Sequence, residues 1–440
     1  MDYLARTLDA VADWRSAAGP APSHPALEPD AERFEAAFTE FSERMAGSYP
    51  FHHPRYAGQM LKPPHPVAIA AYTAAMHVNP NNHALDGGPA TSFMELEVMA
   101  WLTEMFGFPE GSLGHLTSSG TIANLEALWV ARELHPGKAV VHGTNAHYTH
   151  ERMCAVLGME SFAVPSHADG RIDLDVVEKL CATGDIGMVV VTAGTTGAGT
   201  VDDIARAVAL RERFGVRVHV DAAYGGFFTL LAREALVSES FLAIAGADSV
   251  VVDPHKHGLQ PYGCGAVLFR DPGVGRLYKH DSPYTYFTSA ELHLGEISLE
   301  CSRAGAAAAA LWLTLRALDL GPVLAAGVRA ARAWAELIRA SDALTLFREP
   351  ELDIVTYFPT RGRASEIDAA SEHVLAAGMS DPDPVYLSTL RIDAPAFVAL
   401  HPGVEMDAEG VRVLRSVLMK PEHEPHVPWL HERVTAISRP

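Results

Sequence analysis

Cysteine is scarce in this sequence, and its spacing argues against two classes of protein. Only four cysteines occur among 440 residues. They form no CxxC motif, and their intervals are not those of zinc ligands. We therefore expect neither a disulfide-stabilised scaffold nor a zinc-binding fold, and we interpret all four as reduced thiols of the core. They are Cys154, Cys181, Cys264 and Cys301.

An excess of basic residues and a long apolar run are also missing. Lysine and arginine number 34 against 54 aspartates and glutamates, which gives a formal charge of −20. Surfaces that bind nucleic acids or anionic lipids need the opposite balance, so we expect no nucleic-acid and no membrane partner. The sequence has no charged-then-apolar leader and no apolar run of about 18 residues. We therefore expect a soluble, cytoplasmic protein.

Histidine is plentiful in the first part of the chain, but it lacks the spacing of metal ligands. Four histidines occur between residues 51 and 82, at positions 52, 53, 65 and 77. Their intervals do not fit a zinc site, so we predict no metal. This stretch is poorly periodic and rich in proline and asparagine, which is compatible with a site entrance.

Short apolar, β-branched runs alternate with helical patterns through the middle of the chain. Four such runs lie at residues 139–142, 187–192, 216–220 and 249–252. Small or polar residues follow each run, as they do in successive strand-loop-helix units. We therefore predict an α/β fold with a doubly wound, mainly parallel sheet. We predict a further strand at residues 266–269, where the chain returns to the sheet.

Two smaller regions flank this predicted sheet. Residues 1–50 form a helical arm, whose amphipathic face packs either on another subunit or on the large domain at residues 51–320. A Gly-Pro break opens a small C-terminal α+β domain at residues 321–440. In that domain we predict strands at 353–358 and 385–392 and helices at 323–340, 365–377 and 408–419.

Two neighbouring predicted strands end close to residues with distinct chemical uses. Asp221 follows the strand at 216–220, and Lys256 follows the strand at 249–252. Open α/β sheets bind ligands at the carboxyl ends of their strands. A lysine can form a Schiff base with an aldehyde, and a carboxylate can keep a pyridine nitrogen protonated. The pair indicates pyridoxal phosphate, although each residue alone is more typical of a helix cap or a surface lysine.

A stretch rich in small and hydroxyl side chains has the properties of a phosphate site. Residues 115–124 include Ser119, Gly120 and Thr121 and lead directly into a helical pattern at 125–134. Backbone N–H groups and hydroxyls therefore gather at a positive helix N-terminus. The stretch lacks the lysine of a nucleotide P-loop, so a nucleotide is not the expected ligand.

Three side chains are candidates for work beside the reacting atoms. His147 lies at a strand-to-helix turn, where its ring can stack on a cofactor or cap the helix. Tyr284 and Tyr286 lie in a poorly periodic segment at residues 280–300. Segments of this kind are often lids, and a tyrosine there can supply a proton. Burial at a subunit contact is the alternative role for these tyrosines.

Three arginines are candidates for binding a substrate carboxylate, because a guanidinium holds a carboxylate bidentately. They are Arg303, Arg391 and Arg415. A surface salt bridge is the alternative for each, and the sequence does not choose between them.

Together these motifs resemble the group II pyridoxal-phosphate-dependent amino-acid decarboxylases, which include aromatic-amino-acid, glutamate and cysteine-sulfinate decarboxylases. The resemblance covers residues 56–421 and rests on the segments 117–121, 145–147, 194–196, 219–224 and 253–256. It implies the aminotransferase-like fold type I and a homodimer. It further implies Schiff-base formation by Lys256, a pyridinium contact for Asp221, a ring stacked between His147 and Ala223, a contact near the cofactor's hydroxyl for Thr196, and phosphate contacts from Ser119, Gly120, Thr121 and His255.

The expected activity is pyridoxal-phosphate-dependent decarboxylation of an L-amino acid to an amine and carbon dioxide. A carbon-carbon lyase is one alternative, since residues 302–305 resemble a stretch of the sphingosine-phosphate lyases. A cysteine desulfurase is another and would need a mobile cysteine, for which Cys301 is the nearest candidate. A cofactor-binding protein without catalysis is the third. Substitution of Cys301 by serine would test the desulfurase reading.

Overall fold

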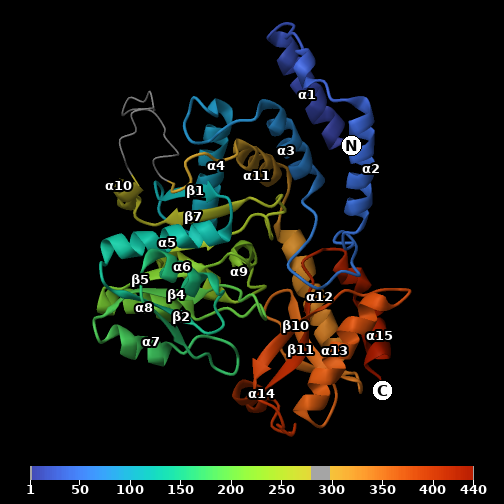
Figure 1. Ribbon diagram of the computed structural model, residues 1–440. Coiled ribbons are helices and arrows are strands. Elements are labelled where there is room, and N and C mark those ends of the chain that lie inside the picture. The colour runs from blue at the N-terminus through green and yellow to red at the C-terminus, as the bar shows by residue number, and fades with distance from the viewer. Residues whose placement is uncertain (1, 279–297, 440) are drawn as a thin grey trace.

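The computed structural model describes residues 2–278 and 298–439, and its centre is a seven-stranded sheet (Figure 1). The strands are β1 (Leu113–Thr117), β2 (Ala139–Gly143), β3 (Ser161–Val164), β4 (Ile186–Thr192), β5 (Arg217–Asp221), β6 (Ser249–Val252) and β7 (Gly265–Phe269). They lie in the order β1-β7-β6-β5-β4-β2-β3. The five strands predicted from apolar runs are all present, whereas that pattern does not predict β1 or β3.

The direction of the strands sets the place of the site. β3, β2, β4, β5 and β6 pair in parallel. β7 is antiparallel to both β6 and β1, so β1 points the same way as β6. The carboxyl ends of six strands therefore meet at one edge of the sheet. The predicted α/β fold with a mainly parallel sheet is confirmed.

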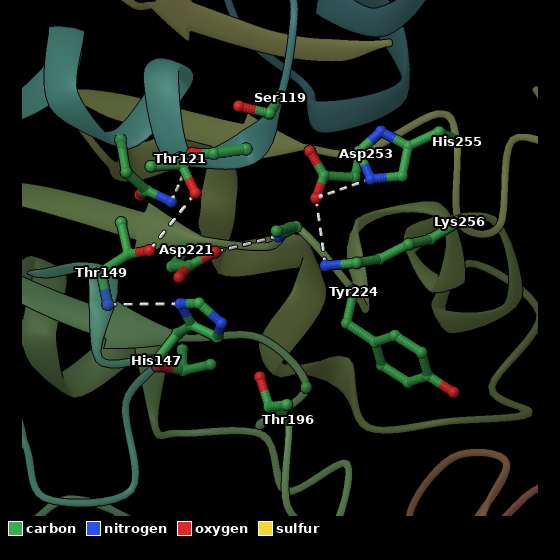
Figure 2. Close-up of a pocket in the computed structure, with 15 residues that line it drawn as sticks. Ser119, Thr121, His147, Thr149, Thr196, Asp221, Tyr224, Asp253, His255 and Lys256 are labelled. Carbon is green, nitrogen blue, oxygen red and sulfur yellow. Dashed lines mark hydrogen bonds and ion pairs between the residues drawn. The ribbon is translucent and has the colours of Figure 1, made fainter. Parts of the chain in front are cut away.

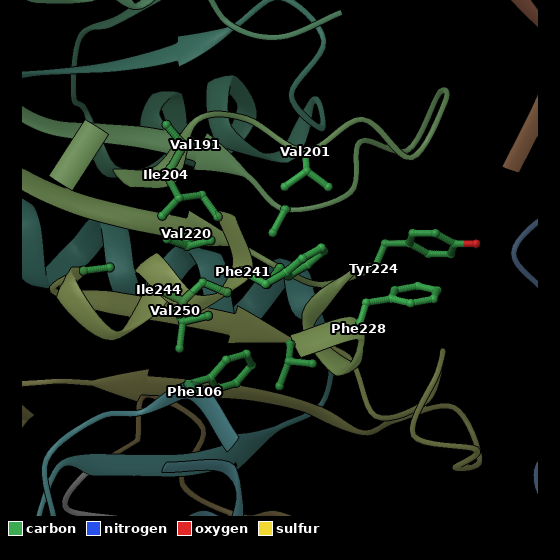
Figure 3. Packing of buried hydrophobic residues seen from close by; sticks show 14 of the residues in the cluster. Phe106, Val191, Val201, Ile204, Val220, Tyr224, Phe228, Phe241, Ile244 and Val250 are labelled. Carbon is green, nitrogen blue, oxygen red and sulfur yellow. The ribbon is translucent and has the colours of Figure 1, made fainter. Parts of the chain in front are cut away.

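The inner strands are buried on both faces, which explains their continuous apolar sequences. Every residue of β2, β4, β5, β6 and β7 is buried. Figure 3 shows Val191, Val220 and Val250 from three neighbouring strands packed with Phe241 and Ile244. The helices of this region are α4 (Pro89–Phe106), α5 (Gly120–Leu134), α6 (Thr149–Leu157), α7 (Leu174–Cys181), α8 (Ile204–Phe214) and α11 (Gly305–Ala317).

The C-terminal part contains a second, antiparallel sheet. Its strands are β8 (Leu344–Arg348), β9 (Ile354–Pro359), β10 (Ser388–Asp393) and β11 (Gly410–Val417), in the order β10-β11-β9-β8. The helices α12 (Gly321–Arg339), α13 (Ala364–Ser380) and α15 (His423–Ser438) accompany it. The large core includes Leu324 and Val328 from beyond residue 321. The domain boundaries therefore stay predictions.

The helix predicted at residues 408–419 is wrong, because β11 occupies this segment. β11 is an inner strand with β10 on one side and β9 on the other. Seven of its eight residues are buried. Val411, Leu414 and Leu418 mimic helical spacing, but burial on both faces of a sheet also removes the alternation that marks a strand. The β-branched Val413 and Val417 were the better signal.

The N-terminal arm is helical, as predicted. α1 (Tyr3–Ala17) contacts α3 (Pro66–Val78), where the Thr7 hydroxyl lies 3.3 Å from the carbonyl oxygen of Ala70. One face of α1 thus packs on its own chain, although Trp14 stays 55% exposed. α2 (Ala31–Ala46) contains no buried residue and stands at the margin of the molecule (Figure 1).

Within the described ranges, no single helix is long and apolar enough to cross a bilayer. α11 and α12 meet that criterion only as a pair, and the pair is bent by 83°. Both helices bury many of their residues in the protein.

Candidate active site

A pocket opens at the edge of the sheet where the strands end (Figure 2). All nine residues predicted to contact a cofactor line this pocket: Ser119, Gly120, Thr121, His147, Thr196, Asp221, Ala223, His255 and Lys256. They come from five segments that follow β1, β2, β4, β5 and β6. The topology thus brings together side chains that the sequence separates by up to 137 positions.

The Lys256 amine is held inside the pocket by a carboxylate that the sequence reading did not assign. Lys256 Nζ lies 3.0 Å from Asp253 Oδ2, and the Lys256 side chain is 20% exposed. Asp253 Oδ1 is buried and has no hydrogen-bond partner within the part of the chain that the structure describes. A Cβ atom at Gly120 would lie 2.6 Å from this oxygen, so the close approach requires glycine. Asp253 lies three positions before the lysine, and this spacing was the available signal.

Asp221 ends β5 and is fixed by hydrogen bonds to both carboxylate oxygens. The Nε2 atom of His150 lies 2.8 Å from Asp221 Oδ2, and the Ala223 N–H donates to Oδ1 over 3.1 Å. Burial alone raises the pKa of Asp221, but the hydrogen bonds from His150 and from the Ala223 N–H oppose it, and the pKa lies well below its ordinary value. Asp221 is therefore ionised at neutral pH.

His147 lines the pocket and also accepts a hydrogen bond at the start of a helix, while its stacking on a cofactor stays a prediction. The N–H of Thr149 donates to His147 Nδ1 over 3.3 Å at the start of α6. Burial lowers the pKa of His147, and the ring is therefore neutral at pH 7. Because Nδ1 accepts a hydrogen bond, the single ring proton is on Nε2. The ring offers that N–H to its surroundings.

The opposite end of the pocket has the donors of an anion site. Ser119 caps α5, and its hydroxyl accepts the N–H of Ile122 over 3.3 Å. The first N–H groups of α5 thus begin at Gly120, beside the Thr121 hydroxyl. His255 Nδ1 donates to the Cys264 carbonyl over 2.7 Å, and burial lowers the pKa of this histidine.

Arg415 lies beside the pocket and is bound mostly to neutral oxygens. Its guanidinium donates to the carbonyls of Gly197 (2.8 Å), Thr196 (2.7 Å) and Gly58 (3.1 Å) and to the Ser388 hydroxyl (3.0 Å). Four of its five N–H groups are thus used. It lines a second cavity of about 420 Å³ that shares His147 and Thr196 with the first. Within residues 2–278 and 298–439, no carboxylate forms an ion pair with it.

Arg303 and Arg391 do not line this pocket in the described part of the chain, although Arg391 lines the second cavity together with Arg415. Arg303 Nη1 is 2.6 Å from the buried Glu95 carboxylate and 2.6 Å from the Leu116 carbonyl. Arg303 therefore forms an ion pair inside the protein. The Arg391 side chain is 63% exposed and lies 3.9 Å from Asp368. Tyr284 and Tyr286 lie outside the described residues.

Further pocket residues were missed by sequence reasoning. They are Asn124, Thr149, Thr192, Gly194, Tyr224 and Asp253. The Tyr224 hydroxyl donates to Asp353 over 2.5 Å, and Asp353 also lies 3.3 Å from the ring of His257. The sequence placed Tyr224 near the site but gave no sign of Asp353, which is 129 positions away and belongs to the C-terminal part.

Comparisons with known proteins agree with this geometry. The model of the pyridoxal-dependent decarboxylase conserved domain matches residues 26–358. A probable L-tyrosine/L-aspartate decarboxylase of Methanopyrus kandleri is 33% identical over 328 residues, which cover 72% of this chain and 85% of that protein. An L-aspartate/L-glutamate decarboxylase of Pyrococcus horikoshii is 28% identical and covers 72% of this chain, with 82% of its own length matched.

Solved structures share the fold at low identity. Mouse CSAD superposes with a TM-score of 0.82 at 20% identity, covering 99% of this chain and 98% of its own. Oryza sativa TDC, solved with PLP and tryptamine, gives a TM-score of 0.80 at 19% identity, covering 99% and 97%. The predicted fold type I is thereby confirmed. The chain belongs to the pyridoxal-dependent decarboxylase family and is a pyridoxal-phosphate-dependent amino-acid decarboxylase.

Proposed function

We propose that the pocket described above is where an L-amino acid loses its carboxyl group, with Lys256, Asp221 and His147 as the residues that do the work. One observation carries this proposal. An amine, an ionised carboxylate and a neutral imidazole face a single pocket at the N-terminus of α5. Ionisable side chains with these three properties around one pocket are typical of an active site.

The donor set fits pyridoxal phosphate. We assign its phosphate to the start of α5 with Ser119, Gly120, Thr121 and His255, where N–H groups and the helix dipole favour an anion. α5 begins at Gly120, so the first N–H groups of this helix are at the pocket. Asp221 would then hold the ring nitrogen, His147 and Ala223 would hold the two faces of the ring, and Thr196 would serve its hydroxyl side.

When bound, pyridoxal phosphate supplies an aldehyde for an amine and a ring that withdraws electrons from the substrate. The chain supplies the rest. Lys256 would provide the amine that holds the cofactor's aldehyde and that the substrate amine replaces. Asp221, which is ionised at neutral pH, would keep a proton on the ring nitrogen.

A proton must replace the lost carboxyl group on the α-carbon. We propose Tyr284 or Tyr286 as the donor, with His147 as the second candidate because its Nε2 carries a proton at neutral pH. Substituting each tyrosine by phenylalanine and His147 by glutamine separates the candidates. The donor's variant should lose turnover by about 10²- to 10⁴-fold while the substrate still binds.

We place the substrate carboxylate near Arg415. The guanidinium carries a positive charge that no described carboxylate neutralises, and one of its N–H groups remains available. The side chain of the substrate extends into the cavity that Arg415 lines. Relatives are named for tyrosine, aspartate, glutamate and diaminobutyrate, so these four amino acids form the first assay panel.

Replacement of Lys256 by alanine tests the proposal. The variant should lose both carbon dioxide release and the absorption band of the lysine-linked cofactor. Lys138→Ala is the matched control, because Lys138 is an exposed lysine and is not among the pocket residues. Carbon dioxide release by Lys256→Ala at the rate of Lys138→Ala would contradict the assignment.

The alternative activities gain no support from the pocket. Cys301 is exposed, unlike the other three cysteines, and it is not among the pocket residues. Its predicted place in the core is therefore wrong, and the described structure does not place it in the pocket. The Ser-Arg stretch that resembles the lyases contains Arg303, which is bound to Glu95.

We also propose that the chain works as a homodimer joined partly through α2. Phe34, Phe38 and Phe41 lie along one side of α2 and are 51%, 53% and 57% exposed. These aromatic side chains form an exposed apolar stripe on a helix without buried residues, and such a surface is typical of a protein–protein contact. A second copy of the chain as the partner fits the homodimer expected from the sequence. Phe38→Asp should lower the mass in sedimentation equilibrium, whereas Glu43→Gln on the same helix should not.

A cytoplasmic location and the absence of nucleic-acid and membrane partners stay predictions from composition. The charge of −20 supports them. Fractionation of the producing cells tests the location, and a dimer of unchanged mass in the presence of DNA or anionic vesicles is the expected result.

A further inference from the structure

The carboxylate that faces the cofactor ring has a buried histidine behind it. His150 lies in α6, its side chain is fully buried, and its Nε2 is 2.8 Å from Asp221 Oδ2. Asp221 belongs to β5, so this contact joins a helix to the sheet beneath the pocket. His150 itself is not among the pocket residues. It therefore acts on the reaction only through Asp221.

The hydrogen bond from His150 has a defined direction. A carboxylate only accepts, so Nε2 carries the proton of this bond. Nδ1 is buried and has no hydrogen-bond partner among the described residues. The contact with Asp221 is therefore the hydrogen bond that these residues give to the ring.

Both oxygens of Asp221 are held, and each keeps a lone pair. One oxygen accepts from His150 and the other from the Ala223 N–H. Rotation of the carboxylate would break both bonds. Two donors also stabilise the ionised form over the protonated one.

We propose that His150 is a positioning residue that holds Asp221 ionised and correctly turned, and so keeps the ring nitrogen of the bound cofactor protonated. The proposal rests on the proposed function of Asp221. Pyridoxal phosphate fits the pocket, and His150 adds a second donor to the residue that faces its nitrogen. A solely structural histidine would instead affect stability and leave the cofactor's protonation unchanged.

Two substitutions at this position and one control separate these roles. His150→Phe keeps a ring and removes the donor, whereas His150→Gln keeps an amide N–H that can reach the carboxylate. His142→Phe is the control, because the His142 ring is buried only 6.2 Å from that of His150 and makes no contact with Asp221. All three are prepared as the full-length holoenzyme.

The decisive measurement is the ¹⁵N chemical shift of the pyridine nitrogen in enzyme loaded with ¹⁵N-labelled pyridoxal phosphate. Between pH 7 and 8, the native enzyme and His142→Phe should give the shift of a protonated nitrogen. His150→Phe should move toward the unprotonated value, and His150→Gln should stay near the native one. Turnover of His150→Phe should fall by about 10- to 100-fold with little change in KM, as expected from one lost bond to a charged group.

A protonated nitrogen in His150→Phe across this range, together with native turnover, would overturn the proposal. If His150→Phe does not fold, His150→Leu, which also removes the donor, takes its place: a ¹⁵N shift toward the unprotonated value supports the proposal, and a native shift with native turnover contradicts it. Failure of the proposed decarboxylation is distinguishable, because the nitrogen shift is read without any substrate.

Discussion

Replacing Asp353 by asparagine should stabilise the protein at pH 8 and have little effect at pH 4. Asp353 is fully buried at the start of β9, and the Tyr224 hydroxyl donates to it over 2.5 Å. Among the described residues, its second oxygen is buried without a hydrogen-bond partner, although His257 lies 3.3 Å away. Burial raises the pKa of Asp353 to about 6 against the opposing effects of Tyr224 and Lys62.

The magnitude follows from this shift. A carboxyl with a pKa near 3.9 in the unfolded chain and about 6 in the folded one binds its proton more tightly when folded. Its contribution to stability is full below pH 4 and is lost as pH rises through 6. The loss is about 3 kcal/mol, because each pKa unit corresponds to roughly 1.4 kcal/mol. Asparagine carries no charge at any pH and places an N–H₂ group opposite the neutral ring of His257.

Urea unfolding of the two proteins, measured from pH 4 to 8, checks this reasoning. The free energy of unfolding of Asp353→Asn should exceed that of the native protein by up to about 3 kcal/mol at pH 8, or about 3 °C in Tm. The two curves should converge near pH 4. A difference that is constant with pH, or a loss of stability at pH 8, would refute the charge argument.

Other perturbations have distinct expected outcomes. Asp202→Asn should destabilise the protein by about 1–3 kcal/mol at pH 8, because both oxygens of Asp202 accept backbone N–H groups and asparagine can replace only one of these acceptors. This loss is expected even though burial raises the pKa of Asp202 to about 6, and the same urea series tests it. Arg415→Met should lower kcat/KM by more than about 100-fold in the carbon dioxide assay, and Arg415→Lys should restore little. Gly225→Ala should abolish soluble expression, since its Cβ would lie 2.1 Å from the Ala193 carbonyl oxygen.

The large sheet could be predicted because its inner strands are buried on both faces and carry few polar residues before their ends. The same logic located Lys256 and Asp221, whose chemistry is recognisable in sequence. The same pattern gave the wrong prediction for β11, because the spacing of Val411, Leu414 and Leu418 fits a helix as well as a strand. Only its pairing with β9 and β10 decides between them.

Long-range partners were beyond the reach of the sequence. His150 lies 71 positions from Asp221, and nothing in its neighbourhood distinguishes it from a surface histidine of a helix. Arg303 has the composition of a carboxylate ligand and finds its carboxylate inside the protein, in Glu95. The type of a residue predicts which hydrogen bonds and ion pairs it can form, whereas the tertiary fold determines its partner residues.

The position of Arg415 along the chain has a consequence for biosynthesis. Once Lys256 has been added to the growing chain, every residue that lines the cofactor pocket has been synthesised, but the carbonyls of Thr196 and Gly197 still lack the Arg415 guanidinium, which comes 218 positions after Gly197. During translation, all the pocket residues therefore exist before Arg415 can bind this rim. The rim at Thr196 and Gly197 is thus fixed later in synthesis than the residues that line the pocket.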